Sequence, residues 1–77
     1  MSTQVTNAVG DVMFINQYGQ LHSTTGWAIK YIDGTIGYWV NGKRDRKGGP
    51  AVVYPKHSPV MIKPDEYWEN GVLIGFK

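Results

Sequence analysis

Three Asx-Gly dipeptides constrain the fold of this chain more than any other feature. They are Asp33-Gly34, Asn41-Gly42 and Asn70-Gly71, and apolar or aromatic residues lie close to each of them. A two-residue type I′ hairpin turn needs a positive φ at both central residues, and these dipeptides supply it. No window of the sequence carries a sustained apolar stripe at helical spacing. The sequence therefore predicts β-hairpins and little helix.

The clearest hairpin spans residues 27–40, WAIKYIDGTIGYWV. A two-residue loop at Asp33-Gly34 makes Trp27 face Val40 across the hairpin. One face then carries only apolar or aromatic side chains, namely Trp27, Ile29, Tyr31, Ile36, Tyr38 and Val40. The opposite, mixed face carries Ala28, Lys30, Ile32, Thr35, Gly37 and Trp39. A half-buried antiparallel sheet requires this asymmetry, so we expect the first set to form the core together with Val52, Tyr54 and Tyr67.

Other strand candidates lie at Asp11–Asn16, Ala51–Tyr54 and Val60–Ile62. Prolines punctuate the stretch after residue 54, and proline cannot donate to a β-ladder, so this stretch is an edge strand or a loop. A chain of 77 residues makes one domain at most. We expect a flexible N-terminus over residues 1–10 and a single β-repeat domain over residues 11–77.

Composition and motifs argue against several classes of function. The chain has no cysteine, a net charge of only +2, no signal-peptide pattern and no apolar run long enough to span a membrane. It contains no G-x-S-x-G, P-loop, HExxH or EF-hand pattern. His22 and His57 lack metal-ligand spacing, and Asp65 and Glu66 point to opposite faces of a strand. The sequence thus predicts a cytoplasmic, non-enzymatic protein with no catalytic residue, metal, cofactor or membrane insertion.

The chain also repeats itself. GWAIKY at residues 26–31 aligns with GPAVVY at 49–54, and YWVNG at 38–42 aligns with YWENG at 67–71. The two offsets are 23 and 29, because six additional residues follow Tyr54. Stacked units that cannot bury a face alone form one continuous sheet. We therefore predict an all-β fold, a small antiparallel meander of about two and a half repeated β-hairpins, built as a single twisted sheet or a half-barrel.

Residues 39–54, WVNGKRDRKGGPAVVY, resemble the W-x-N-G-K-x-H-R-x-x-G-P-A hairpin repeat of small bacterial and bacteriophage proteins, a variant of the MORN repeat. The matching residues are Asn41, Gly42, Lys43, Arg46, Gly49, Pro50 and Ala51. Asp45 occupies the family's His position, and Trp27 replaces Pro in the preceding copy. The resemblance covers roughly residues 21–73. It implies stacked β-hairpins that bind or scaffold without catalytic residues, and a phage accessory protein that acts in the host cytoplasm.

Two features are candidates for a binding site. The basic loop of residues 43–47 either faces an anion or only keeps a sheet edge soluble. Trp39 and Trp68 are repeat equivalents on the mixed face, and they are either an exposed interaction surface or part of a second core. A tight Asn41-Gly42 turn places Arg44 across from Trp39, with its guanidinium against the indole. The candidate partner-binding residues are Trp39, Trp68, Lys30, Lys43, Arg44, Arg46 and Lys47.

These residues favour a small non-catalytic interaction protein that binds and occludes a protein partner, such as a host enzyme or a defence component. The alternative is a nucleic-acid-binding β module, in which the basic loop meets phosphates and the aromatic rings stack on bases. The MORN resemblance adds acidic lipid as a third partner, which the weak net charge and the missing amphipathic helix disfavour. A homodimer through the shortened last repeat also stays open.

Overall fold

The computed structural model describes residues 3–55 and 64–76, so the expected strand at Val60–Ile62 and the loop residue His57 lie outside the described residues. The described part contains nine strands and no helix. They are β1 (Thr3–Thr6), β2 (Val12–Ile15), β3 (Ile29–Lys30), β4 (Ile36–Gly37), β5 (Trp39–Val40), β6 (Lys43–Arg44), β7 (Val52–Val53), β8 (Glu66–Glu69) and β9 (Val72–Phe76). The predicted all-β class is confirmed, and no helix in this part could cross a membrane.

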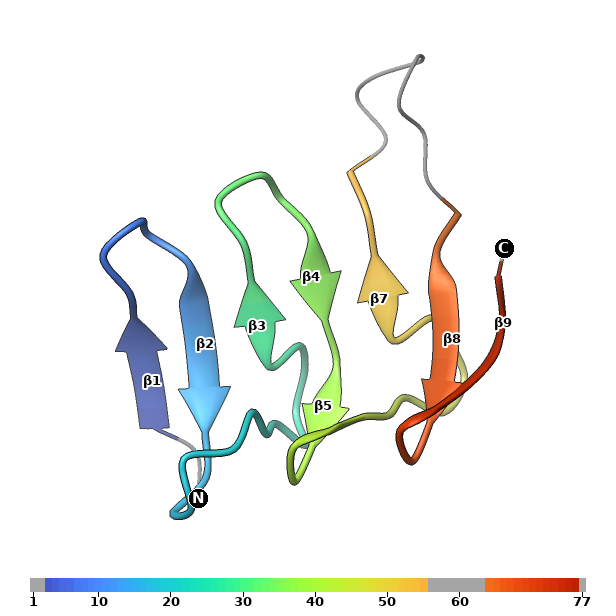
Figure 1. Ribbon diagram of the computed structural model, residues 1–77, viewed down its shortest axis with the longest axis horizontal. Coiled ribbons are helices and arrows are strands. Elements are labelled where there is room, and N and C mark those ends of the chain that lie inside the picture. The colour runs from blue at the N-terminus through green and yellow to red at the C-terminus, as the bar shows by residue number, and fades with distance from the viewer. Residues whose placement is uncertain (1–2, 56–63, 77) are drawn as a thin grey trace.

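Seven strands form one antiparallel sheet in the order β1-β2-β3-β4-β7-β8-β9. The remaining two, β5 and β6, form a separate hairpin on the path from β4 to β7. Figure 1 shows the strands of the larger sheet side by side in chain order, with β1 at one edge and β9 at the other, and β5 continuing the path of β4. The principal extents are 38 × 29 × 16 Å, and the short third dimension is that of a thin molecule. The predicted meander is therefore confirmed as one sheet, extended by a short hairpin.

Two of the three Asx-Gly dipeptides form the predicted turns. Asn41-Gly42 has φ values of 49° and 80°, and Asn70-Gly71 has 51° and 81°. Val40 pairs with Lys43, which leaves two residues in the first loop. Positive φ at both central positions defines a type I′ turn, and its twist matches that of the flanking strands.

The Asp33-Gly34 turn differs from the prediction. Of these two residues only Gly34 has a positive φ, 97°. The Tyr31 N–H donates to the Thr35 carbonyl at 2.8 Å, and the Gly34 N–H donates back to the Tyr31 carbonyl at 2.9 Å. These bonds close a three-residue loop with glycine in the left-handed position, which is the second common hairpin geometry. Ile29 consequently pairs with Gly37 and not with Tyr38.

The extra loop residue shifts the pairing register by one, so the side chains of one strand point to the face opposite the predicted one. The predicted division into an apolar and a mixed face is therefore wrong. Ile29 shares its face with Gly37, Val52 and Trp39, while Lys30 pairs with Ile36 on the opposite face. We call the first the tryptophan face (Ile29, Gly37, Trp39, Val52 and Trp68) and the second the lysine face (Lys30, Ile36, Tyr38 and Val53). The Trp39 indole covers Gly37, where an added Cβ would lie 3.0 Å from Trp39 Nε1 and 3.1 Å from Ile29 Cγ2.

The core is smaller than predicted. The buried apolar side chains are Ala28, Ile29, Ala51 and Val52, with at most 6% exposure. This confirms Ile29 and Val52 from the predicted core, whereas Tyr31 is 38% exposed and its assignment to the core is wrong. The other members of the predicted core are half-buried: Trp27, Ile36, Tyr38, Val40, Tyr54 and Tyr67. A thin sheet covers large side chains only in part. The two side chains with no exposed area are the small, repeat-equivalent Ala28 and Ala51.

Equivalent backbone hydrogen bonds recur from one repeat to the next. In each case the turn glycine donates its N–H to a carbonyl in the preceding hairpin. The two bonds join Gly42 to Leu21 and Gly71 to Arg44, both at 2.9 Å. A second equivalent pair joins Ser23 to Trp39 at 3.0 Å and Arg46 to Trp68 at 3.1 Å. These bonds reproduce the offsets of 23 and 29 that the sequence predicts for the repeat.

The sheet begins earlier than the sequence predicts. Residues 3–6 form β1 and pair with β2 over four positions, where a flexible N-terminus was expected. Threonine and valine suit a strand, and Asn7 closes the turn that follows. Its Oδ1 accepts the N–H groups of Val9, Gly10 and Asp11 at 3.0–3.1 Å. Such an Asx turn aligns the two strands, and it was not predicted from the sequence.

The left-handed turn glycines supply a test of the repeat. Gly42→Ala should lower the free energy of unfolding by about 1 kcal/mol or more, because φ is +80° there and the Cβ would lie 3.3 Å from Gln20. Gly26→Ala is the matched control, since its φ is not positive and no atom lies within 4 Å of the added Cβ. Urea denaturation measures both changes. Equal effects at the two glycines would contradict the turn assignment.

Candidate functional site

The Asn41-Gly42 turn assembles a ladder of two indoles and one guanidinium on the tryptophan face. Trp39 on β5 is the register partner of Arg44 on β6, as the sequence predicts. The Arg44 Cζ lies 5.1 Å from the ring centroid of Trp39 and 4.9 Å from that of Trp68 on β8. One guanidinium thus contacts two aromatic rings from different repeats, within the range of a cation–π interaction. We call this group the Trp39–Arg44–Trp68 ladder.

Glu66 holds one tryptophan of the ladder in place through a hydrogen bond. Its Oε1 accepts a hydrogen bond from Trp68 Nε1 at 2.9 Å, and its Oε2 accepts one from the Tyr54 hydroxyl at 2.7 Å. This second bond is the main cause that raises the pKa of Tyr54 above its ordinary value, and partial burial adds to it. The Arg44 charge acts on the same phenol in the opposite direction. The indole of Trp68 is therefore held in a fixed orientation by a carboxylate that also holds Tyr54.

Arg44 carries an unusual donor. Among the described residues, its Nε is buried and has no hydrogen-bond partner. A buried donor without an acceptor costs about 1–3 kcal/mol of stability. With an indole beside the guanidinium on two sides, the terminal N–H groups are best reached from the edge, which is how a carboxylate binds arginine with two parallel hydrogen bonds. The ladder can therefore accept a planar anionic group better than a third ring stacked on the same guanidinium.

A hollow of about 330 Å³ opens over the ladder. It is lined by Trp39, Gly42, Lys43, Arg44, Trp68, Asn70 and Gly71. The two turns lie close together at this hollow, because the Gly71 N–H donates to the Arg44 carbonyl at 2.9 Å and Gly71 lies against the Lys43 side chain. On β9, Leu73 is the register partner of Trp68 and is 40% exposed, which extends the apolar surface beyond the hollow.

The structure divides the predicted site residues between two surfaces. Trp39, Trp68, Lys43 and Arg44 line the same hollow. Lys30 instead lies exposed on the lysine face, opposite the ladder. The basic loop of residues 43–47 does not act as a single surface either, since its other two cations, Arg46 and Lys47, line a separate hollow with Tyr38 and Val40.

Arg46 has a structural explanation that the sequence analysis overlooked. Its Cζ lies 4.0 Å from the Tyr38 ring centroid, and its Nη1 donates to the Pro50 carbonyl at 3.0 Å. A Cβ on Gly49 would lie 2.9 Å from the Arg46 Cζ, so only glycine leaves room for the guanidinium. The Arg, Gly and Pro of the repeat thus form one cradle, and Arg46 lines a different hollow from Trp39 and Trp68, with which the sequence grouped it as a candidate partner-binding residue.

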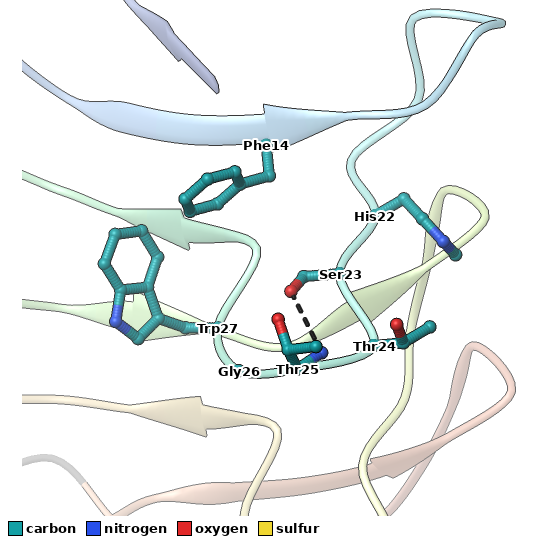
Figure 2. Close-up of a pocket in the computed structure, with 7 residues that line it drawn as sticks. All are labelled: Phe14, His22, Ser23, Thr24, Thr25, Gly26 and Trp27. Atoms are coloured by element: carbon teal, nitrogen blue, oxygen red, sulfur yellow. Dashed lines mark hydrogen bonds between the residues drawn. The ribbon is translucent and has the colours of Figure 1, made fainter. Parts of the chain in front are cut away.

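A second surface consists of two hollows whose lining residues differ from those of the ladder, and Figure 2 shows the residues of one of them. One hollow of about 540 Å³ is lined by Phe14, His22, Trp27 and the loop of residues 23–26. The hollow that contains Arg46 measures about 510 Å³ and shares the same loop. His22 Nδ1 accepts the Asn41 N–H at 2.9 Å, which ties this loop to the turn beneath the ladder. The sequence gives Ser23, Thr24 and Thr25 no motif, so this surface was not predicted.

The Tyr54–Glu66 bond predicts a specific response to pH. The folded pKa of Tyr54 is raised, so its contribution to stability is complete below the unfolded value of 10.0 and is lost as the pH rises through the folded pKa. Tyr54→Phe should cost about 1 kcal/mol at neutral pH and nothing in strong alkali. Urea denaturation from neutral to alkaline pH checks this. Parallel stability curves for the two proteins would contradict it.

No family model, curated protein or solved structure matches the chain.

Proposed function

We propose that this chain is a non-catalytic interaction protein, and that the Trp39–Arg44–Trp68 ladder is the surface by which it binds and occludes a protein partner. One observation carries the proposal: Arg44 lies between two tryptophans at the base of a hollow, 5.1 and 4.9 Å from their centroids. Tryptophan and arginine are the residues most enriched among those that dominate the binding energy of protein interfaces. Here both kinds converge on one small surface.

The chemistry of the ladder suggests what the partner presents. The cationic donors that line the hollow are the half-buried Arg44 and the exposed Lys43, so an aspartate or glutamate side chain of the partner can accept charge-assisted hydrogen bonds there. Around these donors, Trp68 and the partly exposed Leu73 offer apolar area. A partner segment with a carboxylate beside apolar residues complements this arrangement.

Kinship with the MORN-like repeats of bacterial and bacteriophage proteins belongs to the same proposal. The recurring glycine-to-carbonyl hydrogen bonds between neighbouring hairpins support it, because they follow the sequence repeat residue by residue. So does the Arg46 cradle, which gives the Arg, Gly and Pro of the repeat a shared structural role. In this proposal the partner is a host protein in the cytoplasm.

Arg44→Met tests the proposal without disturbing the fold. Methionine keeps an unbranched chain between the indoles and removes both the charge and the buried, unpartnered Nε. Stability should therefore change by less than about 1 kcal/mol. The variant should lose its partner, because truncating a central interface residue costs about 2 kcal/mol or more of binding energy.

The experiment immobilises the wild type, Arg44→Met and Lys30→Met, and quantifies by mass spectrometry the proteins retained from a bacterial lysate. Lys30→Met is the matched control, because Lys30 is exposed on the lysine face. We expect at least one protein to be retained by the wild type and the control and lost with Arg44→Met. Equal retention by all three would contradict a role for the ladder, and so would loss with Lys30→Met alone.

A further inference from the structure

The loop of residues 23–26 lines two hollows, and we call this pair of neighbouring hollows the furrow (Phe14, residues 22–27, Tyr38, Val40 and residues 45–47). It is separate from the tryptophan ladder, since the residues that line the two surfaces do not overlap. The hollows measure about 540 and 510 Å³, each within the range of sites that hold small molecules or parts of polymers.

The furrow changes in chemistry from one end to the other. At one end lie two aromatic rings, Phe14 and Trp27, with centroids 5.5 Å apart and planes tilted by 54° (Figure 2). The middle is the Ser23-Thr24-Thr25 loop, in which Thr24 and Thr25 are exposed. The other end holds the exposed Lys47 and the Arg46 guanidinium that lies over Tyr38. Aromatic, hydroxyl and cationic groups thus follow one another in order.

We propose that the furrow binds single-stranded nucleic acid. A nucleotide presents a planar base, a sugar with polar oxygens and an anionic phosphate in the same order. The base would stack on Trp27, the sugar would lie along Thr24 and Thr25, and the phosphate would meet Lys47. Stacking on an aromatic ring needs an exposed base face, which a single strand offers and a duplex hides.

The surrounding charges set the expected strength of binding. Asp45 also lines the furrow, and the net charge of the chain is only +2. The affinity should therefore resemble non-specific binding, with a Kd on the order of 10 µM at low salt, and should fall as salt rises. Base-stacking proteins tolerate most sequences, so a preference among bases is not expected to be large.

Fluorescence anisotropy with a labelled oligothymidylate tests the proposal on the whole chain. Lys47→Ala should weaken binding about threefold and lower the salt slope by about one. Trp27→Ala should weaken binding about tenfold. Because Trp27→Ala can disturb the fold, Thr24→Glu serves as a second variant. It places a carboxylate on an exposed loop residue, so it should abolish binding while thermal stability stays unchanged.

Arg44→Met is the control that separates this surface from the ladder, and it should bind the oligonucleotide within about twofold of the wild type. A duplex of the same length and heparin distinguish a strand site from a general response to polyanions. The proposal is overturned by an absence of binding at low salt, by equal binding of Thr24→Glu, or by equal affinity for heparin. Each of these results leaves the proposed role of the ladder in protein binding intact.

Discussion

Gly37→Val is expected to lower the free energy of unfolding by about 3 kcal/mol, near the upper end of the usual cost of overpacking. Gly37 is buried at the centre of the sheet, where it pairs with both Ile29 and Val52. An added Cβ would lie 3.0 Å from Trp39 Nε1 and 3.1 Å from the Ile29 Cγ2. The two further methyl groups of valine have no space, so the indole must leave its position.

Gly75→Val is the matched control for this substitution. Gly75 also lies in a strand, β9, but no atom lies within 4 Å of an added Cβ and its φ is not positive. Valine suits strands better than glycine, so the control should be neutral or slightly stabilising. Chemical denaturation of both variants compares them directly. A loss at Gly75 as large as that at Gly37 would contradict the position of Trp39 over the sheet.

Trp39→Ala is expected to lower the free energy of unfolding by about 2–3 kcal/mol, somewhat less than the loss for a fully buried tryptophan. The indole is half-buried, covers Gly37 and flanks the Arg44 guanidinium. Its removal opens a cavity over the centre of the sheet. From the sequence alone, Trp39 is either part of an exposed interaction surface or part of a second core, and only in the second case does its removal cost stability.

Tyr18→Ala serves as the aromatic control for Trp39→Ala. Tyr18 lies in a turn and is 76% exposed, so its loss should change stability by no more than about 0.5 kcal/mol. Thermal denaturation of the two variants under one set of conditions is sufficient. If Trp39→Ala were as stable as Tyr18→Ala, the indole would not cover Gly37, and Trp39 would be a surface residue, which is one of the two alternatives that the sequence leaves open.

The sequence predicts the hairpin repeat well because its signals are local. Asn41-Gly42 and Asn70-Gly71 have the backbone preferences of a type I′ turn, and the structure places both in it. The position of Arg44 across from Trp39 follows from that turn alone, and it is confirmed. Where a single dipeptide fixes both the loop length and the register, sequence reasoning reaches the level of individual side-chain neighbours.

The Asp33-Gly34 hairpin marks the limit of this reasoning. Asp-Gly fits a two-residue loop and also a three-residue loop with glycine in the left-handed position, and the structure has the second. The alternation of apolar residues favoured the wrong register, because the prediction required one face of the sheet to be buried and the other to be open. In a thin sheet both faces hold half-buried aromatic residues, such as Trp39 on one and Tyr38 on the other. The alternation therefore carries little information about register.

The candidate sites were predictable only in part, for the same reason. Charge alone grouped the cations of residues 43–47, but β6 ends at Arg44, and beyond this end of the strand Arg46 lies over Tyr38 while Arg44 lies over two indoles. The furrow loop of residues 23–26 has no charge and no motif. Its position beside Trp27 and Lys47 depends on contacts between repeats, such as the Ser23 N–H to Trp39 carbonyl bond.

The three tryptophan indoles report separately on the two surfaces, since Trp39 and Trp68 belong to the ladder and Trp27 to the furrow. The most direct test of the account is therefore a ¹H–¹⁵N NMR spectrum of the indole N–H groups, recorded while the captured protein partner is added. The account predicts that the Trp39 and Trp68 signals shift and the Trp27 signal does not. A shift of Trp27 alone, with Trp39 and Trp68 unmoved, would contradict it.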